Sequence, residues 1–124
     1  MTPRRELVGR RGEEAAARFY ESAGFTVIDR NWRCPQGELD LVVADGAGGL
    51  LVFCEVKTRT SSAFGSPAEA VTPAKVRRLR RLAGHWMAEA RPSGCSPSIL
   101  RVDVAVVRPG PDGRAVVEVV ENAC

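Results

Sequence analysis

The stretch "GELDLVVADGAGGLLVFCEVKTRT" (residues 37–60) contains two apolar runs separated by a glycine-rich break. Each run is short and rich in branched side chains, which is typical of a β-strand. The break "GAGG" (46–49) supplies glycines, which accept the positive φ angles that tight loops need. The stretch therefore predicts a β-hairpin with a four-residue loop, in which Asp45 faces Leu50.

Three charged residues interrupt these apolar runs: Asp40 in the first, and Glu55 and Lys57 in the second. Counting back five residues on each side of the loop places Asp40 directly opposite Glu55, and directly opposed residues share one face of a sheet. Lys57 lies two residues after Glu55 and projects from the same face. An even-length loop therefore predicts two acids and a lysine side by side.

Two interpretations of this cluster are open. Adjacent carboxylates repel each other unless a cation lies between them, and oxygen ligands from two acids suit Mg²⁺ together with water and phosphate oxygens. A lysine beside such an ion orients an attacking water or stabilises charge on a phosphate, which points to metal-assisted phosphodiester hydrolysis. The other interpretation is an ordinary cross-strand ion pair, in which Lys57 neutralises Glu55 or Asp40.

The remaining segments alternate helix and strand signals. A 3.6-residue apolar rhythm predicts a first helix, Ser66 with Pro67 opens a short helical turn that has a capping-box pattern, and Thr72 with Pro73 opens a longer helix. The expected helix is 4–23 and the expected strands are 25–33, 38–45, 50–59, 99–107 and 115–121. This pattern predicts one α/β domain over residues 1–124, with a mixed central β-sheet flanked by helices in the order α-β-β-β-α-β-β.

Composition narrows the class of protein. The 124 residues hold four cysteines without a CxxC pair and a single histidine, so neither a zinc site nor a disulfide framework is expected. No apolar run approaches the roughly 20 residues that span a bilayer. The N-terminal segment is charged throughout, unlike a secretory signal. We therefore expect a cytoplasmic protein without a membrane contact.

Positive charge is concentrated in one segment, although the formal net charge is only +3. Five of the seven residues from 75 to 81 are cations: Lys75, Arg77, Arg78, Arg80 and Arg81. Such a cluster can neutralise phosphates, and a solvated helix face explains it equally well.

Five blocks of the sequence, in order, resemble a known family. They are "GRRGEEAAARFYESAGFTVIDRNWR", "GELDLVV", "FCEVKTR", "FGSPAEAV…K" and "RVDVAVV". Together they resemble the YraN-like family of small bacterial proteins, which is grouped with Holliday junction resolvases and with nucleases of the PD-(D/E)xK, restriction endonuclease-like superfamily. The resemblance implies a restriction endonuclease-like fold. It extends from Gly9 to about Val107.

The same resemblance implies roles for individual residues. Asp40 and Glu55 match the metal-binding acids, the backbone carbonyl of Val56 is a further ligand, and Lys57 matches the catalytic lysine. Glu13 resembles a first-helix glutamate that supports the metal, although a solvated helix face would explain it as well. The metal implied is Mg²⁺ or Mn²⁺. The residues expected to contact nucleic acid are Arg59, Lys75, Arg77, Arg78 and Arg81.

The function expected from these residues is a metal-dependent DNA endonuclease that acts on branched or structured DNA. A homodimer is expected by analogy, because a four-way junction needs two symmetric cuts. The alternative is a module that binds nucleic acid or a protein partner on a nuclease scaffold without turnover. Site chemistry of this kind does not distinguish DNA from RNA.

Overall fold

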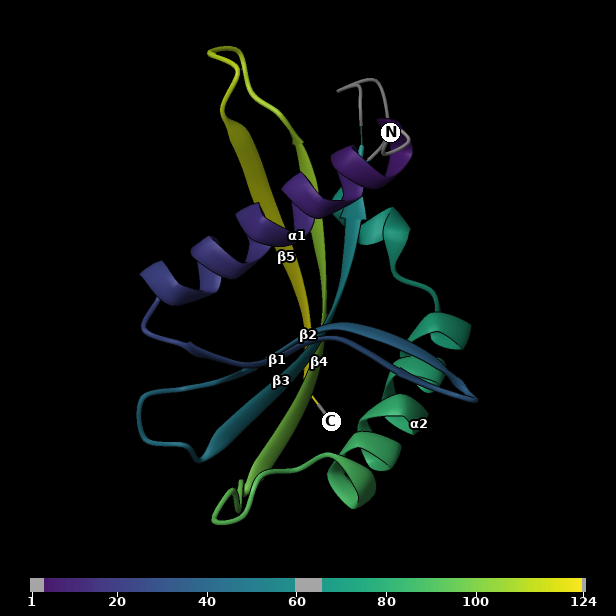
Figure 1. Cartoon of the computed structure of the whole chain (residues 1–124). Helices are drawn as coiled ribbons and strands as arrows, with labels where there is room; N and C mark the ends of the chain where they lie inside the picture. The colour runs from purple at the N-terminus through teal and green to yellow at the C-terminus, as the bar shows by residue number, and fades with distance from the viewer. Residues whose placement is uncertain (1–3, 60–65, 124) are drawn as a thin grey trace.

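The fold follows the predicted order of elements and includes the short helical turn expected after Ser66. A computed structural model describes residues 4–59 and 66–123 (Figure 1). The elements are α1 (Arg4–Ser22), β1 (Thr26–Cys34), β2 (Gly37–Ala44), β3 (Leu50–Thr58), η1 (Pro67–Ala70), α2 (Pro73–Glu89), β4 (Ile99–Pro109) and β5 (Ala115–Ala123). The predicted mixed α/β fold is confirmed, and its architecture is consistent with a nuclease-like core.

The five strands form one mixed sheet in the order β1-β2-β3-β4-β5. Strands β3 and β4 are parallel, whereas the other neighbouring pairs are antiparallel. Parallel neighbours need a long crossover connection, and here η1 and α2 supply it between β3 and β4. This crossover brings the basic segment of α2 back over the strand that carries Glu55 and Lys57.

The two helices cover opposite faces of the sheet (Figure 1). Helix α2 packs Leu79 and Trp86 against Phe53, and these residues belong to the larger apolar cluster. Helix α1 packs Ala17 and Tyr20 against the other face, where they form a second cluster with the strands. Each face of β3 is therefore buried against a different helix, which explains why its apolar run is nearly continuous.

Local signals account for the helix ends. Gly24 has a φ of 93°, and the Phe25 N–H donates to the Tyr20 carbonyl at 2.9 Å, which is the hydrogen bond of a Schellman motif. Thr72 is the N-cap of α2, and its hydroxyl accepts a hydrogen bond from the Lys75 N–H at 3.1 Å. Neither helix of the described ranges is long and apolar enough to cross a lipid bilayer.

The short turn at η1 differs in one detail from the sequence prediction. Pro67–Ala70 forms a 3₁₀ helix, so the predicted helical turn is confirmed. The side chain of Ser66 makes no capping hydrogen bond, so the predicted capping box is wrong. The backbone closes the turn instead, because the Glu69 N–H donates to the Ser66 carbonyl at 3.0 Å.

A buried polar network joins α1 to β4. The carboxylate of Asp103 is 1% exposed and accepts a 2.7 Å hydrogen bond from the Tyr20 hydroxyl. The guanidinium of Arg101 donates to both oxygens of Asp103, each at 2.9 Å. The contacts satisfy the buried carboxylate, so Arg101 and Asp103 form a structural ion pair, as their alternate positions on one strand suggest.

Candidate metal and nucleic-acid site

The β2–β3 hairpin has the predicted register. The Asp45 N–H donates to the Leu50 carbonyl at 3.1 Å and closes the loop over residues 46–49. The ladder runs from Ala44 paired with Leu51 to Leu41 paired with Cys54. Asp40 and Glu55 are the next residues in this register, one position beyond the last pair.

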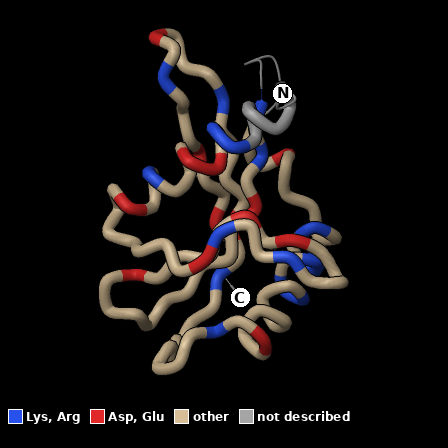
Figure 2. The backbone as a smooth tube through the Cα atoms, in the orientation of Figure 1, with Lys and Arg blue, Asp and Glu red and all other residues tan. Residues whose placement is uncertain are grey.

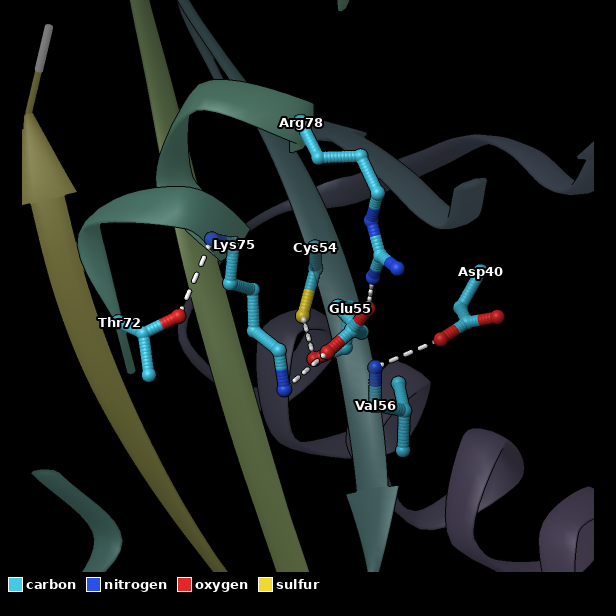
Figure 3. Close-up of polar contacts among 7 residues, drawn as sticks. All are labelled: Asp40, Cys54, Glu55, Val56, Thr72, Lys75 and Arg78. Atoms are coloured by element: carbon cyan, nitrogen blue, oxygen red, sulfur yellow. Dashed lines mark hydrogen bonds and ion pairs between the residues drawn. The ribbon is translucent and has the colours of Figure 1, made fainter. Parts of the chain in front are cut away.

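Asp40 joins the two strands where the backbone ladder ends. Its Oδ2 accepts a hydrogen bond from the Val56 N–H at 2.7 Å (Figure 3). Burial raises the pKa of the Asp40 carboxyl, the hydrogen bond from Val56 lowers it, and the negative charges of Glu38 and Glu55 raise it further. The positive charge of Lys57 lowers the same pKa, so this lysine is an electrostatic neighbour of the Asp40 carboxylate.

Asp40 and Glu55 face different helices, although a regular hairpin would place both on one face: Asp40 lines a pocket under α1, whereas Glu55 contacts α2. Leu39 belongs to the cluster on the α2 side of the sheet, whereas Leu41 belongs to the cluster on the α1 side. In a regular strand these alternate residues would face the same way. The strand therefore twists at Asp40, and this residue lines a pocket under α1.

That pocket has a volume of about 250 Å³ and lies between α1 and the first two strands. Its lining residues are Arg10, Glu13, Glu14, Arg30, Asn31, Asp40 and Leu41. Burial raises the pKa of the Glu13 carboxyl, and the negative charges of Asp40 and Glu38 raise it further. A hydrogen bond from Asn31 lowers it. The positive charge of Arg10 also lowers it, so three carboxylates and two arginines line the pocket, and the net effect of its surroundings raises the Glu13 pKa.

Glu55 points toward α2 and is held there by two cations (Figure 3). Its Oε2 lies 2.9 Å from the Lys75 Nζ, and its Oε1 accepts a hydrogen bond from the Arg78 guanidinium. The Glu55 side chain is 13% exposed and that of Lys75 is 17% exposed. Within the described part of the chain, the buried Oε2 accepts no well-aligned hydrogen bond.

The residues next to Glu55 have separate environments. Val56 is half-buried, packs against the cluster on the α1 side and uses its N–H for Asp40. Lys57 is half-buried and pairs with Val106 of β4 in the sheet. The Arg59 N–H donates to the Val107 carbonyl at 2.7 Å, which extends the β3–β4 ladder by one residue.

The carboxylates fit a divalent cation by their chemistry, but they are not assembled around one point. Glu13 and Asp40 line one pocket and repel each other, and the buried Oε2 of Glu55 is paired with the Lys75 ammonium without a well-aligned hydrogen bond within the described residues. In the described ranges, no three His, Cys, Asp or Glu side chains converge closely enough to enclose a metal ion. Completing such a site requires the Glu55 carboxylate to leave its two cations on α2.

The predicted nucleic-acid residues on α2 differ in exposure. Arg77, Arg78 and Arg81 are exposed, whereas Lys75 is half-buried against Glu55. The cationic positions follow one another along this helix (Figure 2). The exposed arginines can therefore contact phosphates, although Arg78, like Lys75, also forms an ion pair with Glu55.

Sequence reasoning missed two groups of residues at this site. It assigned Arg30 and Asn31 to an ordinary strand, yet both line the pocket. An asparagine inside a run of β-branched and aromatic residues was the available signal, because asparagine disfavours strands and tolerates a left-handed backbone. The pairing of Lys75 and Arg78 with Glu55 had no local signal, since it joins residues about 20 positions apart.

Comparison with known proteins gives one consistent family. The sequence model of the uncharacterised protein family UPF0102 matches residues 12–107. A UPF0102 protein of Frankia alni is 50% identical over 119 residues, which cover 96% of this chain and 95% of the relative. A UPF0102 protein of Mycolicibacterium gilvum is 53% identical over 109 residues, which cover 88% of this chain and 86% of the relative. A UPF0102 protein of Symbiobacterium thermophilum is 49% identical over 116 residues and 94% of each chain. The chain therefore belongs to the uncharacterised protein family UPF0102, the YraN family that its sequence blocks resemble.

Proposed function

We propose that this chain is a Mg²⁺- or Mn²⁺-dependent DNA endonuclease that hydrolyses phosphodiester bonds in branched or structured DNA in the cytoplasm. The observation that carries the proposal is the group of carboxylates in the pocket between α1 and β2. Glu13 and Asp40 line this pocket. The Asp40 carboxylate accepts a hydrogen bond from the Val56 N–H, which lies between Glu55 and Lys57 on β3. Carboxylates gathered in this way suit a hard divalent cation.

The residues that would hold the cation are Asp40 and Glu55, with the Val56 carbonyl as a further ligand and Glu13 in support. When bound, Mg²⁺ would polarise a phosphate oxygen and favour attack by water. The ammonium of Lys57, an electrostatic neighbour of Asp40, would stabilise the negative charge that develops on the phosphate.

The arginines provide affinity for the DNA backbone rather than sequence recognition. Arg77, Arg78 and Arg81 are exposed on α2, where they would neutralise phosphates without reading bases. Lys75, at the start of α2, pairs with the candidate ligand Glu55, and Arg59 directly follows β3. We propose a homodimer as the active unit, because a four-way junction needs two symmetric cuts.

The test is cleavage of labelled four-way junction, flap and linear duplex DNA in the presence of Mg²⁺ or Mn²⁺. Wild-type protein is compared with Glu55→Gln, Lys57→Met and the control Glu118→Gln. Glu118 is a matched control, because it is also a strand glutamate paired with an arginine, Arg108, but lies on β5. We expect metal-dependent cutting that falls on the order of 100-fold or more in the two site variants and is unchanged in the control.

A second function is a DNA-binding module without turnover. The specific observation in its favour is the pairing of Glu55 with Lys75 and Arg78, which turns this acid away from the pocket. If this function holds, the DNA affinity of the wild-type protein will fall with increasing salt concentration and will not depend on Mg²⁺. No substrate will be cut. Metal-dependent cutting that disappears in Glu55→Gln would exclude it.

A further inference from the structure

Asn31 has an unusual backbone in the middle of β1. Its φ is 49°, and it is the single non-glycine residue with a positive φ in the described ranges. The strand pairs normally on both sides of it, with Arg30 opposite Leu41 and Trp32 opposite Leu39. L-residues avoid this left-handed conformation, although asparagine tolerates it better than most. The strained residue therefore lies within a paired strand, directly across from Asp40, rather than in a turn.

The kink has a direct effect on the pocket. Arg30 and Asn31 are consecutive residues, yet both line the cavity under α1. A regular strand would send these two side chains to opposite faces. Asp40 and Leu41, across the ladder, likewise line the cavity as consecutive residues. The left-handed backbone at Asn31 thus accompanies a local twist that brings Asp40 and Asn31 into the same pocket.

Within the pocket, the Asn31 carboxamide faces the carboxylate of Glu13 on α1. With its nitrogen on that side, Asn31 donates to Glu13 Oε1 at 3.2 Å and to Oε2 at 3.1 Å. A carboxylate has only acceptor atoms at neutral pH, so the amide nitrogen rather than the amide oxygen must face it. Both oxygens of Glu13 are therefore engaged by one side chain.

We propose that Asn31 is a positioning residue that holds the Glu13 carboxylate in the pocket beside Asp40, ready to support a divalent cation. This inference rests on the proposed metal-dependent function. Backbone strain persists at positions where the surrounding structure demands it, and such positions cluster at functional sites. Here the strained conformation places a neutral donor opposite Glu13 of α1, where it binds this carboxylate without neutralising its charge.

A purely structural link between α1 and β1 would not need this contact. Arg30 already joins the helix to the strand, because its guanidinium donates to Glu14 at 3.0 Å. Glu14 also pairs with Arg18 on the same helix at 3.8 Å. Removal of the Asn31 side chain therefore leaves a link between the two elements intact, and its effect on Glu13 can be measured by itself.

The experiment uses Asn31→Gly and Asn31→Ala in the full chain. Glycine accepts the left-handed backbone without strain, so Asn31→Gly removes only the side chain, whereas alanine keeps the strain as well. We expect Asn31→Gly to unfold in urea at the wild-type midpoint or above and Asn31→Ala to unfold earlier. We expect both variants to bind Mn²⁺, measured by calorimetry or electron paramagnetic resonance, on the order of tenfold more weakly than wild type.

A second readout tests the contact without any metal. In ¹⁵N-labelled protein, the side-chain amide signals of Asn31 are those missing from Asn31→Gly. We expect these signals to shift in Glu13→Ala and to stay in place in the matched variant Glu14→Ala. Asn31 signals that do not shift in Glu13→Ala would overturn the contact. Wild-type Mn²⁺ affinity in a folded Asn31→Gly variant would overturn the positioning role.

Failure of the proposed function gives a different result. Wild-type protein that neither binds Mn²⁺ nor cuts DNA would overturn the nuclease and, with it, the metal-directed role of Asn31. The amide signals would still decide in that case whether Asn31 holds Glu13.

Discussion

Asp40 Oδ2 accepts a 2.7 Å hydrogen bond from the backbone N–H of Val56, at the point where the β2–β3 ladder ends. A side chain therefore replaces a backbone carbonyl as the partner of this N–H. Asp40 consequently has a structural role in addition to the proposed metal-binding role, and an alanine substitution would remove both at once.

Substitutions at Asp40 separate these two roles. Asp40→Asn keeps an oxygen acceptor for the Val56 N–H, so we expect its free energy of unfolding to stay within about 0.5 kcal/mol of wild type. Asp40→Ala leaves a part-buried N–H without this partner and should lose about 1–3 kcal/mol. Urea denaturation measures both. Equal stability of the two variants would contradict the structural role, and retained Mn²⁺ binding by Asp40→Asn would contradict the metal-binding role.

The ion pairs of Glu55 predict an effect on DNA affinity. Neutralising this acid by Glu55→Gln frees Lys75 and Arg78 for phosphates, so we expect tighter DNA binding in low salt. The slope of log affinity against log salt should steepen by about 0.9 for each cation that reaches duplex phosphate. Fluorescence anisotropy over a salt series measures this slope.

The control for that prediction is Glu118→Gln on β5, at the opposite end of the strand order from β1, which releases Arg108 on the neighbouring strand β4. We expect its salt slope to match that of wild type. A Glu55→Gln variant whose affinity and slope are unchanged would indicate that Lys75 and Arg78 do not face DNA.

Close packing of α1 on β3 predicts a sharp difference between two helical glycines. A Cβ atom at Gly12 would lie 2.0 Å from the Thr58 Oγ1, whereas a Cβ at Gly84 would meet nothing within 4 Å. Gly12→Ala should therefore cost about 1–3 kcal/mol of stability through overpacking. Gly84→Ala, on the exposed face of α2, should gain up to about 1 kcal/mol from helix propensity.

Urea denaturation of the two variants tests this difference, and the double variant Gly12→Ala/Thr58→Ala tests its cause. Removing the Thr58 hydroxyl clears the nearest atom, so the double variant should recover part of the stability lost in Gly12→Ala. A Gly12→Ala protein as stable as wild type would show that α1 lies farther from β3.

The cysteines should differ in reactivity. Cys54 is fully buried, and burial raises the pKa of its thiol to about 12. Because the folded pKa lies above that of an exposed thiol, the thiol stays protonated in the native state at pH 8. Its contribution to stability is present at that pH and is lost as the pH rises toward 12. Cys34 and Cys95 are only partly buried.

Iodoacetamide labelling at pH 8, followed by mass spectrometry, tests this ordering. We expect Cys34 and Cys95 to react in the native protein and Cys54 to react only when urea unfolds it. Native labelling of Cys54 at the rate of Cys95 would contradict the buried position of the central part of β3.

Local sequence patterns specify the element order and the hairpin register. Both are local properties: strand and helix periodicities are short-range, and the GAGG loop sets which residues oppose one another across β2 and β3. The five sequence blocks that resemble the YraN-like family led to the same family as the comparisons. The capping pattern at Ser66 was the local signal that failed, because the backbone closes that turn without the side chain.

The directions in which the site side chains point depend on long-range contacts. Strict alternation along β2 would place Asp40 with Glu55, but the twist opposite the left-handed Asn31 turns Asp40 toward Glu13 on α1. Glu55 turns instead to Lys75 on α2, because the crossover between parallel strands brings this helix over the other face of the sheet. These contacts depend on elements distant in the chain, so no local pattern specifies them.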